Sequence, residues 1–393
     1  MVFITKNMIN NMINTKNITN ILIIFLIIFV ILIYFKFNDK QIHIDNINKN
    51  DITFRKCGHL KNHETIKKVL DENNINKSMK DWDIYLPCGY NYVEGELQTI
   101  KVKNSNQRIF AIKGCDKIAS KNNLWKILRD YYGRPKASKL MPETYIISDP
   151  ADMKIFQQNY SPDRLYLLKK NVQRKEGIIL THDYNKIMKH TDYKVVQEYV
   201  DNLYILKKRK INLRLYLLIV CKEGKVSGYL YNKGKCIYTN KDFSNKDSSA
   251  SNFDKINSNK EVRETHLTSV NLDTSIYDTY PETLENLEEY MGQNQFNKLW
   301  NRILNLFQDL MDAIQGHVCD LKSLDKVLTF QLFGADIIFD TKLNPYLLEL
   351  NKGPSMKYMT KIDEKMKDNL TNDIFIKVGV INKEPINKFI TLN

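Results

Sequence analysis

The stretch FGADIIFDTKLNPYLLELNKGPSM, residues 333–356, consists of two apolar runs joined by a short polar segment. Apolar runs of this length predict β-strands, and the segment 340–345 between them predicts the loop of an antiparallel hairpin. The second run ends in a carboxylate and an amide, Glu349 and Asn351, shortly before a Gly-Pro pair. A strand that only filled a core would need neither group, so these residues indicate a functional site at the tip of the hairpin.

The expected register of this hairpin brings three oxygen-bearing side chains to one face. In a hairpin centred on that loop, Asp336 lies opposite Glu349, and Asn351 shares their face because side chains alternate along a strand. A shift of one residue in the register would undo this arrangement. The side chains expected on the other face, toward a core, are those of Ile337, Phe339, Leu348 and Leu350.

Asp336, Glu349 and Asn351 are the residues that we expect to bind a metal ion. Two carboxylates that face each other repel unless a positive charge lies between them. Hard oxygen donors without histidine or cysteine suit Mg²⁺, which binds one or two carboxylates together with phosphate oxygens and water. The alternative is a solvated hairpin tip whose acidic residues bind nothing.

Cations that could neutralise phosphate groups follow a second predicted strand, LYLLKK at 165–170. Lys169 ends its apolar part, and Arg174 and Lys175 follow in a segment that contains one glycine. This pattern predicts a strand–turn–strand flap that lays lysines over phosphates. The chain contains no GxxxxGK[ST] sequence, so a P-loop is excluded.

The sequence INLRLYLLIV, residues 211–220, predicts a long strand with an arginine on one face. Asn212, Arg214 and Tyr216 alternate with leucines along this strand. A buried arginine has to be paired, and its planar fork holds a carboxylate or a phosphate at two points. An anionic substrate is one candidate partner, and a cross-strand salt bridge is the other.

Composition and charge limit the class of protein. The chain has 393 residues, of which 43% are hydrophobic, enough for a substantial core divided among two or three subdomains. Its formal net charge of +14 suits an acidic partner, although lysine-rich compositional drift would give the same excess. No basic run or RNA-binding signature indicates nucleic acid as a partner. The six cysteines include no CxxC pair, so the spacing indicates neither a disulfide framework nor a zinc ribbon.

An apolar segment near the N-terminus predicts a membrane anchor. The sequence ILIIFLIIFVILIYF at 21–35 is uninterrupted, and a helix extended over 18–37 is about 30 Å long, enough to cross a bilayer. A cleaved signal peptide is the alternative, but no small-residue cleavage site follows the segment. Lysines after it favour a cytoplasmic C-terminal side. We therefore expect a single-pass membrane protein whose catalytic domain is cytosolic.

These signals divide the chain into five parts, which are an N-terminal tail at 1–20, a transmembrane anchor at 21–37, a tether at 38–81, a globular domain at 82–380 and a C-terminal tail at 381–393. Within the globular domain, strand patterns alternate with helix patterns. One helix is expected between Ser120 as its N-cap and Gly133, and another along the apolar stripe from Phe296 to Ile314. The alternation predicts an α/β or α+β fold.

Several of these segments resemble the tubulin–tyrosine ligase-like family. VVQEYVDNLYILKKRKINLRLYLLIV, YLYNKGKCIYTN, HLTS and LFGADIIFDTKLNPYLLELNKGPSM occur in the order seen in that family, and the resemblance covers 82–380. It implies an α+β fold of the ATP-grasp type with N-terminal, central and C-terminal subdomains. It also implies an ATP-dependent ligase, because the family includes tyrosine ligases, polyglutamylases and glycylases.

The resemblance implies roles for individual residues. Asp336, Glu349 and Asn351 would hold Mg²⁺ on the phosphates of ATP, in agreement with the hairpin argument. Arg214 would steady the reacting carboxylate and its acyl phosphate, and Lys169 would contact phosphate as the second catalytic residue. The other residues of the expected ATP site are Lys121, Lys175, Gln197, Glu198, Tyr199, Lys210, His266 and Thr268.

Four positions depart from the family pattern. The flap sequence at 174–178 is one residue short, and Asn212 replaces the usual aspartate before the key arginine. Ser269 stands in place of an asparagine, and Ile237 stands where an arginine is usual. These changes leave the three expected metal ligands intact and affect the handling of the amino-acid substrate.

The expected reaction is ATP-dependent carboxylate–amine ligation. A carboxylate attacks the γ-phosphoryl group to give an acyl phosphate, and an amine then displaces phosphate to form an amide. The expected partners are ATP, Mg²⁺, a free amino acid (tyrosine, glutamate or glycine) and an acidic protein such as tubulin. Two alternatives stay open: a membrane-anchored inactive relative that binds nucleotide or acidic tails without catalysis, and a ligase for a small peptide or metabolite.

Overall fold

The computed structural model describes residues 22–24, 26–27, 42–56, 64–89, 92–171, 177–243, 264–268 and 273–392. Helices and strands alternate along these ranges, which confirms a mixed α+β fold. The strands are β1 (Thr53–Lys56), β2 (Asn76–Lys77), β3 (Ile84–Leu86), β4 (Arg108–Ile109), β5 (Thr144–Ile146), β6 (Tyr166–Lys169), β7 (Ile178–Thr181), β8 (Val195–Glu198), β9 (Ile205–Leu206), β10 (Arg209–Lys222), β11 (Lys225–Tyr231), β12 (Lys235–Tyr238), β13 (Leu328–Phe339), β14 (Pro345–Asn351) and β15 (Phe389–Leu392). The helices are α2 (Glu64–Glu72), α3 (Val93–Thr99), α4 (Cys115–Ala119), α5 (Lys121–Tyr132), α6 (Arg134–Leu140), α7 (Pro150–Asn159), α8 (Tyr184–Lys189), η2 (Thr274–Asp278), α11 (Leu284–Met291), α12 (Gln293–Ile314), η3 (Gln315–His317), η4 (Lys322–Leu324) and α13 (Lys361–Lys377).

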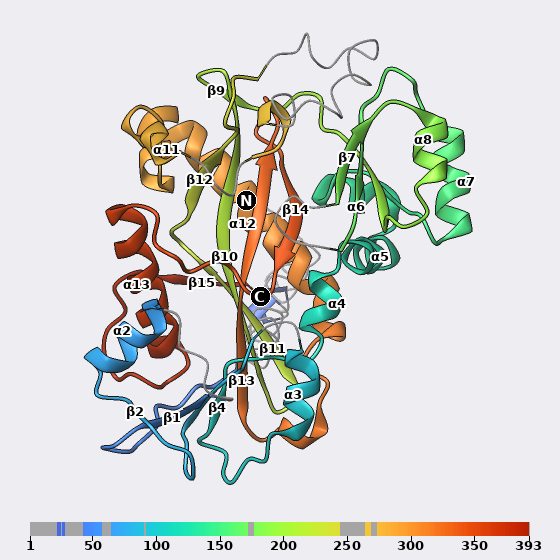
Figure 1. Cartoon of the computed structure of the whole chain (residues 1–393). Helices are drawn as coiled ribbons and strands as arrows, with labels where there is room; N and C mark the ends of the chain where they lie inside the picture. The colour runs from blue at the N-terminus through green and yellow to red at the C-terminus, as the bar shows by residue number, and fades with distance from the viewer. Residues whose placement is uncertain are drawn as a thin grey trace, which may run out of the picture.

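Two long antiparallel strands, β10 and β13, form the centre of an eleven-stranded sheet. The strand order is β15-β11-β10-β13-β4-β3-β1-β2, with β9 and β12 paired to β10 and with β14 paired to β13. Figure 1 shows β10, β13 and β14 running through the middle of the molecule. The hairpin predicted at 333–351 is therefore β13–β14, and the strand predicted at 211–220 lies beside it as β10.

Both faces of the central strands are covered, which explains their nearly continuous apolar sequence. Leu215 and Leu217 pack in one cluster with apolar residues of α12. Leu218 and Val220 point to the opposite face and pack with α13. Arg214 shares this second face but lies toward the other end of β10, so the face changes from apolar to polar along the strand.

A separate sheet of four strands has the order β5-β8-β6-β7. One face packs against α7 and α8 through an aromatic cluster that includes Phe156 and Tyr166 (Figure 1). Lys169 and Gln197 lie on the other face, because their positions alternate with those of Leu168 and Val196 in that cluster. The side chains of Lys169 and Gln197 therefore point away from α7 and α8.

The residues expected to form a tether contribute to the large sheet. Strands β1 and β2 pair in parallel, and β1 also pairs in parallel with β3. Phe54, Val69 and Leu70 are buried in the cluster that covers α13. At the other end of the chain, β15 pairs with β11. The segment expected to be a tether thus packs against α13, and the expected C-terminal tail pairs with β11. Local sequence pattern does not reveal these contacts, because both elements are distant in the chain.

The predicted membrane anchor is contradicted by the structure. In the ranges that the structure describes, no helix is both long and apolar enough to cross a membrane. A bilayer requires about 20 consecutive apolar helical residues, whereas the described helical residues of the segment 21–37 are 22–24 and 26–27. The remainder of that segment lies outside the described residues. The predictions of a single-pass membrane protein and of its topology are therefore wrong on this finding.

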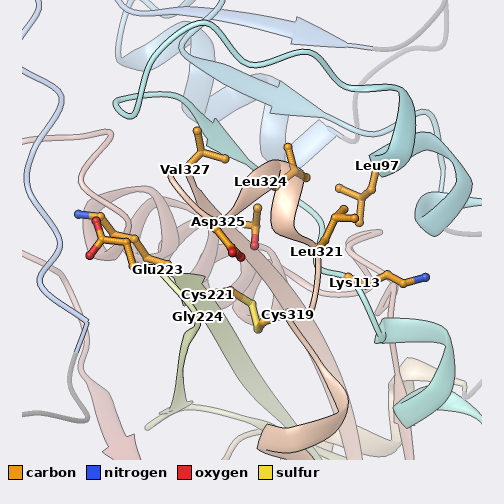
Figure 2. Close-up of a pocket in the computed structure, with 12 residues that line it drawn as sticks. Leu97, Lys113, Cys221, Glu223, Gly224, Cys319, Leu321, Leu324, Asp325 and Val327 are labelled. Atoms are coloured by element: carbon orange, nitrogen blue, oxygen red, sulfur yellow. A yellow bond between two sulfur atoms is a disulfide. The ribbon is translucent and has the colours of Figure 1, made fainter.

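The structure contains a disulfide that the cysteine spacing does not indicate. Cys221, near the end of β10, is bonded to Cys319, with the two Cα atoms 5.7 Å apart. Figure 2 shows this bond in the wall of a pocket that is also lined by Lys113 and Leu324. Cys221 and Arg214 lie on the same strand, and at about 3.3 Å per residue the seven positions between them correspond to roughly 23 Å. The pocket is therefore distinct from the charged end of β10.

Candidate active site

The hairpin has the predicted register at its charged end. Asp336 lies opposite Glu349, and Gly334 lies opposite Asn351. A bulge between Asp336 and Ile337 then shifts the pairing by one residue. As a result Leu347 is buried in the core, whereas Leu348, which the unbroken register placed there, is half-buried in a different cluster.

A bidentate ion pair joins Arg214 to Asp336 across two strands. Arg214 lies directly opposite Asp336 in the β10–β13 pairing. Its Nε donates to Asp336 Oδ1 at 2.6 Å, and its Nη2 donates to Asp336 Oδ2 at 3.0 Å. Of the two partners considered from the sequence, this structure contains the cross-strand salt bridge. Burial raises the pKa of Asp336, while the arginine opposes that rise.

Glu349 is neutralised by a different cation. Lys121, the first residue of α5, places its Nζ 2.9 Å from Glu349 Oε2, and the Asn351 amide nitrogen donates to Glu349 Oε1 at 3.0 Å. Burial alone would raise the pKa of Glu349, but Lys121 and Asn351 outweigh it and hold that pKa at about 2. The two facing carboxylates therefore coexist because each is bound by its own cation.

Three buried lysines from separate elements form a chain that starts at the acidic residues, because Lys121 and Lys169 lie beside Glu349 and Lys210 lies beside Lys169. Besides Lys121, these are Lys169 at the end of β6 and Lys210 at the start of β10, and all three are buried. Lys169 Nζ donates to Gln197 Oε1 at 2.5 Å, and Lys210 Nζ donates to the His266 carbonyl oxygen at 3.1 Å. Burial and a neighbouring lysine lower the pKa of Lys169 to about 8 and that of Lys210 to about 7. Three closely placed ammonium groups of this kind favour a polyanionic ligand.

The other residues of the predicted ATP site are only partly assembled around these lysines. The Tyr199 hydroxyl lies 3.1 Å from His266 Nδ1, and Thr268 accepts a hydrogen bond from the Asn212 amide at 3.1 Å. Burial lowers the pKa of His266 to about 4, so this ring is neutral at pH 7. Lys175 and Ser269 lie outside the described residues.

Glu198 differs from the other predicted ligands because its side chain is directed away from the lysines. Its carboxylate accepts from the Tyr145 hydroxyl at 2.9 Å and lies 2.8 Å from Arg164 Nη1. These partners belong to the face of the small sheet that packs against α7, opposite to Gln197. Alternation along β8 separates the two neighbours, so the Glu198 side chain is not brought to the site.

Gly334 leaves space for Arg214 to reach Asp336, which the sequence reasoning missed. A Cβ atom at position 334 would lie 2.8 Å from Pro354 Cβ and 3.2 Å from Arg214 Cδ. The signal in the sequence is a glycine inside a strand, a position that often marks close approach of another group.

We expect Gly334→Ala to destabilise the protein by about 1–3 kcal/mol. The added methyl group would displace either the rigid ring of Pro354 or the Arg214 side chain, which is held by its ion pair. Urea denaturation measures this free energy of unfolding. Gly95→Ala is the matched control, since no atom lies within 4 Å of its added Cβ, and we expect that helical substitution to stabilise by about 0.5–1 kcal/mol. Equal stability of Gly334→Ala and the unmodified chain would contradict the close approach.

The donor set on β13 and β14 fits Mg²⁺. Asp336, Glu349 and Asn351 offer carboxylate and amide oxygens from one face of one hairpin, and Mg²⁺ prefers such hard donors together with phosphate oxygens. The side chains of Asp336 and Glu349 are 15% and 26% exposed, so they are accessible to an ion. Elsewhere in the described residues, Glu94, Cys115 and Asp116 bring their ligand atoms to within 4.8 Å of one another. The sulfur donor of this group suits Mg²⁺ poorly.

The fold and this site define a class of protein: a mixed α+β chain in which an oxygen-donor hairpin meets buried lysines from a helix, from a second sheet and from the neighbouring long strand. A comparison with known families agrees with that class. Residues 99–387 match the model of the Tubulin-tyrosine ligase family, and the chain belongs to this family. The resemblance noted from the sequence motifs is thus confirmed.

The chain is similar to several tubulin glutamylases. Tubulin polyglutamylase TTLL5 of Mus musculus is 25% identical over 270 residues, which cover 64% of this chain and 19% of that protein. Tubulin monoglutamylase TTLL4 of Mus musculus is 24% identical over 325 residues, or 78% of this chain and 26% of that protein. Tubulin polyglutamylase TTLL7 of Xenopus tropicalis is 25% identical over 328 residues, or 78% and 35%. The chain therefore spans about a fifth to a third of the length of these relatives.

Proposed function

We propose that this protein is an ATP-dependent carboxylate–amine ligase that adds an amino acid to an acidic protein such as tubulin. One observation carries the proposal: Asp336 and Glu349 face each other beside Asn351, the buried lysines 121 and 169 lie beside these carboxylates, and the buried Lys210 lies beside Lys169. This arrangement provides donors for a divalent ion next to cations for a polyphosphate. Membership of the family supports the reaction class.

The main physical difficulty of this reaction is that a carboxylate has to approach a polyanion. Lys121, Lys169 and Lys210 would bind the phosphates of ATP and offset their charge. Arg214 would exchange part of its pairing with Asp336 for the reacting carboxylate and keep it in line with the γ-phosphoryl group. Mg²⁺ on Asp336, Glu349 and Asn351 would supply further charge neutralisation to the phosphates.

Glutamate is the amino acid that we propose for transfer, and tubulin the acceptor. The support comes from three relatives, which are two tubulin polyglutamylases and a tubulin monoglutamylase. The formal net charge of +14 is consistent with an acidic acceptor. Tyrosine and glycine are the other amino acids to be tested, because the residue at position 237 departs from the pattern expected for the family.

An assay with ATP, Mg²⁺, tubulin and each of the three amino acids tests this function directly. The expected result is ATP-dependent incorporation of radiolabelled glutamate into tubulin, with mass spectrometry locating the new amide. Nucleotide binding without incorporation of any of the three would contradict the ligase and favour a binding-only relative. Incorporation into a small peptide but not into tubulin would keep the reaction and replace the acceptor.

Nucleotide binding should be coupled to proton uptake. In the free protein, Lys210 and Lys169 have pKa values of about 7 and about 8, so both are largely uncharged at pH 8.5. A polyphosphate favours their charged forms and raises both pKa values, so binding takes up between about one and two protons at that pH and the affinity falls as the pH rises from 7 to 9. Calorimetry in two buffers of different ionisation enthalpy measures the uptake. Lys210→Met should reduce it, and an affinity independent of pH would contradict the proposal.

A further inference from the structure

The edge of β13 that pairs with β14 has a gap in its strand pairing. On one edge, β10 accompanies β13 along most of its length. On the other edge, β4 pairs with Leu328 and Thr329, and β14 pairs with the residues from Gly334 onward. Within the described part of the chain, the positions 330–333 therefore have no strand partner on this second edge. Two segments leave the sheet there, one after β4 and one after β14.

Gln331 lies in this gap, and its side-chain amide contacts both of the departing segments. Its Oε1 accepts from the Ile112 backbone nitrogen at 3.2 Å, and its Nε2 donates to the Lys352 carbonyl oxygen at 2.7 Å. The side chain is completely buried, and burial of an amide is costly unless its donor and its acceptor are both bonded. Because the two backbone partners have opposite polarity, neither an apolar side chain nor a carboxylate can replace both bonds.

The segments that Gln331 connects lead to the two members of an ion pair in the site. Lys352 directly follows β14, the strand that carries Glu349. Ile112 precedes α4 and α5, and Lys121 is the first residue of α5. Ile112 is buried in one apolar cluster with residues of both helices, so a shift of its backbone would move them as well. Figure 1 shows α4 beside the end of β14.

A second contact joins the same two segments nearer the surface. Lys352 Nζ forms an ion pair with the Asp116 carboxylate of α4. The Asp116 side chain is 45% exposed, so solvent weakens this pair. The buried amide of Gln331 is therefore the stronger of the two connections between α4 and the end of β14.

We propose that Gln331 is a positioning residue of the site, which fixes α5 relative to β14 and thereby sets the contact between Lys121 and Glu349. That contact joins Lys121 Nζ to Glu349 Oε2 at 2.9 Å. Gln331 acts on it through the backbone at Ile112 and Lys352. The consequence for catalysis rests on the proposed ligase function, whereas the positioning is a property of the folded chain.

Urea denaturation of a double-mutant cycle tests the positioning without ATP, Mg²⁺ or turnover. The coupling between Lys121→Met and Glu349→Gln is the non-additive part of their effects on the free energy of unfolding. Most of this coupling should be lost in Gln331→Met, because methionine has a similar volume but cannot hold the two segments together.

Gln107→Met is the matched control. Gln107 is also buried, and its amide likewise joins two backbone groups: it accepts from the Lys103 nitrogen at 2.5 Å and donates to the Trp82 carbonyl oxygen at 2.6 Å. We expect it to lower the urea midpoint about as much as Gln331→Met does, because each change removes two buried hydrogen bonds. The coupling between Lys121 and Glu349 should be unchanged in this variant.

Calorimetric titration of ATP with and without Mg²⁺ gives the second readout. Gln331→Met should reduce the gain in ATP affinity that Mg²⁺ confers by about tenfold, which corresponds to about 1.4 kcal/mol. In Gln107→Met the gain should stay within about twofold of that of the unmodified chain.

The outcomes separate this inference from the proposed function. An unchanged coupling in a folded Gln331→Met variant overturns the positioning role and leaves the ligase intact. A coupling that is lost in a chain that neither binds ATP nor transfers an amino acid supports the positioning role and refutes the proposed function. If Gln331→Met does not fold, Asp116→Asn replaces it, because it weakens the outer contact without changing the core: a smaller coupling supports the positioning role, and an unchanged coupling overturns it.

Discussion

Glu349→Gln should lower the rate of amide formation by on the order of 10³-fold, because removing one charged ligand of a catalytic metal costs several kcal/mol in the transition state. The substitution keeps the shape of the side chain and removes its negative charge. Lys121 then loses the carboxylate that it contacts at 2.9 Å but can still donate to the glutamine oxygen. We therefore expect the variant to remain folded.

Three measurements check this expectation: the rate of glutamate incorporation, the affinity for ATP with and without Mg²⁺, and the free energy of unfolding. The affinity for ATP should become insensitive to Mg²⁺ while binding itself persists. Asp309→Asn is the matched control, because Asp309 is also a carboxylate paired with a lysine, Lys136, at 2.8 Å, but lies on α12. A Glu349→Gln variant with normal turnover would refute the metal site and with it the proposed function.

Arg214→Ala should be the most destabilising of the substitutions considered, at about 3 kcal/mol or more, because it leaves Asp336 buried without its counter-charge. The Arg214 and Asp336 side chains are 20% and 15% exposed, so solvent can compensate only part of the loss. Arg214→Lys keeps the charge but cannot form the two parallel hydrogen bonds at 2.6 and 3.0 Å. It should reduce ligation by about 10²-fold while costing less stability.

A double-mutant cycle with Asp336→Ala isolates the pair. Urea denaturation should show that Arg214→Ala/Asp336→Ala is less destabilised than the sum of the two single changes. Arg129→Lys serves as a control for stability, since Arg129 contacts Asp149 at 3.2 Å in a different cluster, and it should lower stability without lowering turnover of the folded protein. Additive single effects would show that the ion pair contributes nothing to the fold.

Local pattern was sufficient to predict the elements that carry the site. The helix expected between Ser120 and Gly133 is α5, with Ser120 as its N-cap and Gly133 as its C-cap. The apolar stripe from Phe296 to Ile314 lies within α12. These elements follow from periodicity and capping, which depend on near neighbours in the chain.

Local sequence pattern could not predict which distant side chains pair with one another in the folded chain. The sequence left two partners open for Arg214, and pairing of β10 with β13 brought Asp336 to it. The position of Lys235 opposite Arg214 likewise depends on the pairing of β10 with β12. The bulge after Asp336 could not be predicted from the sequence either, because an unbroken apolar run is compatible with both registers.

By itself, the sequence determined that a hairpin at 333–351 presents Asp336, Glu349 and Asn351 on one face, because alternation and loop position are properties of a short segment. It also identified the family. Tertiary structure decided which cations neutralise those oxygens, and it placed β1 and β15 in the large sheet. The physical reason is that charge pairing and strand order depend on residues more than one hundred positions apart, such as Arg214 and Asp336 at a separation of 122. Only packing of the whole chain brings such residues together.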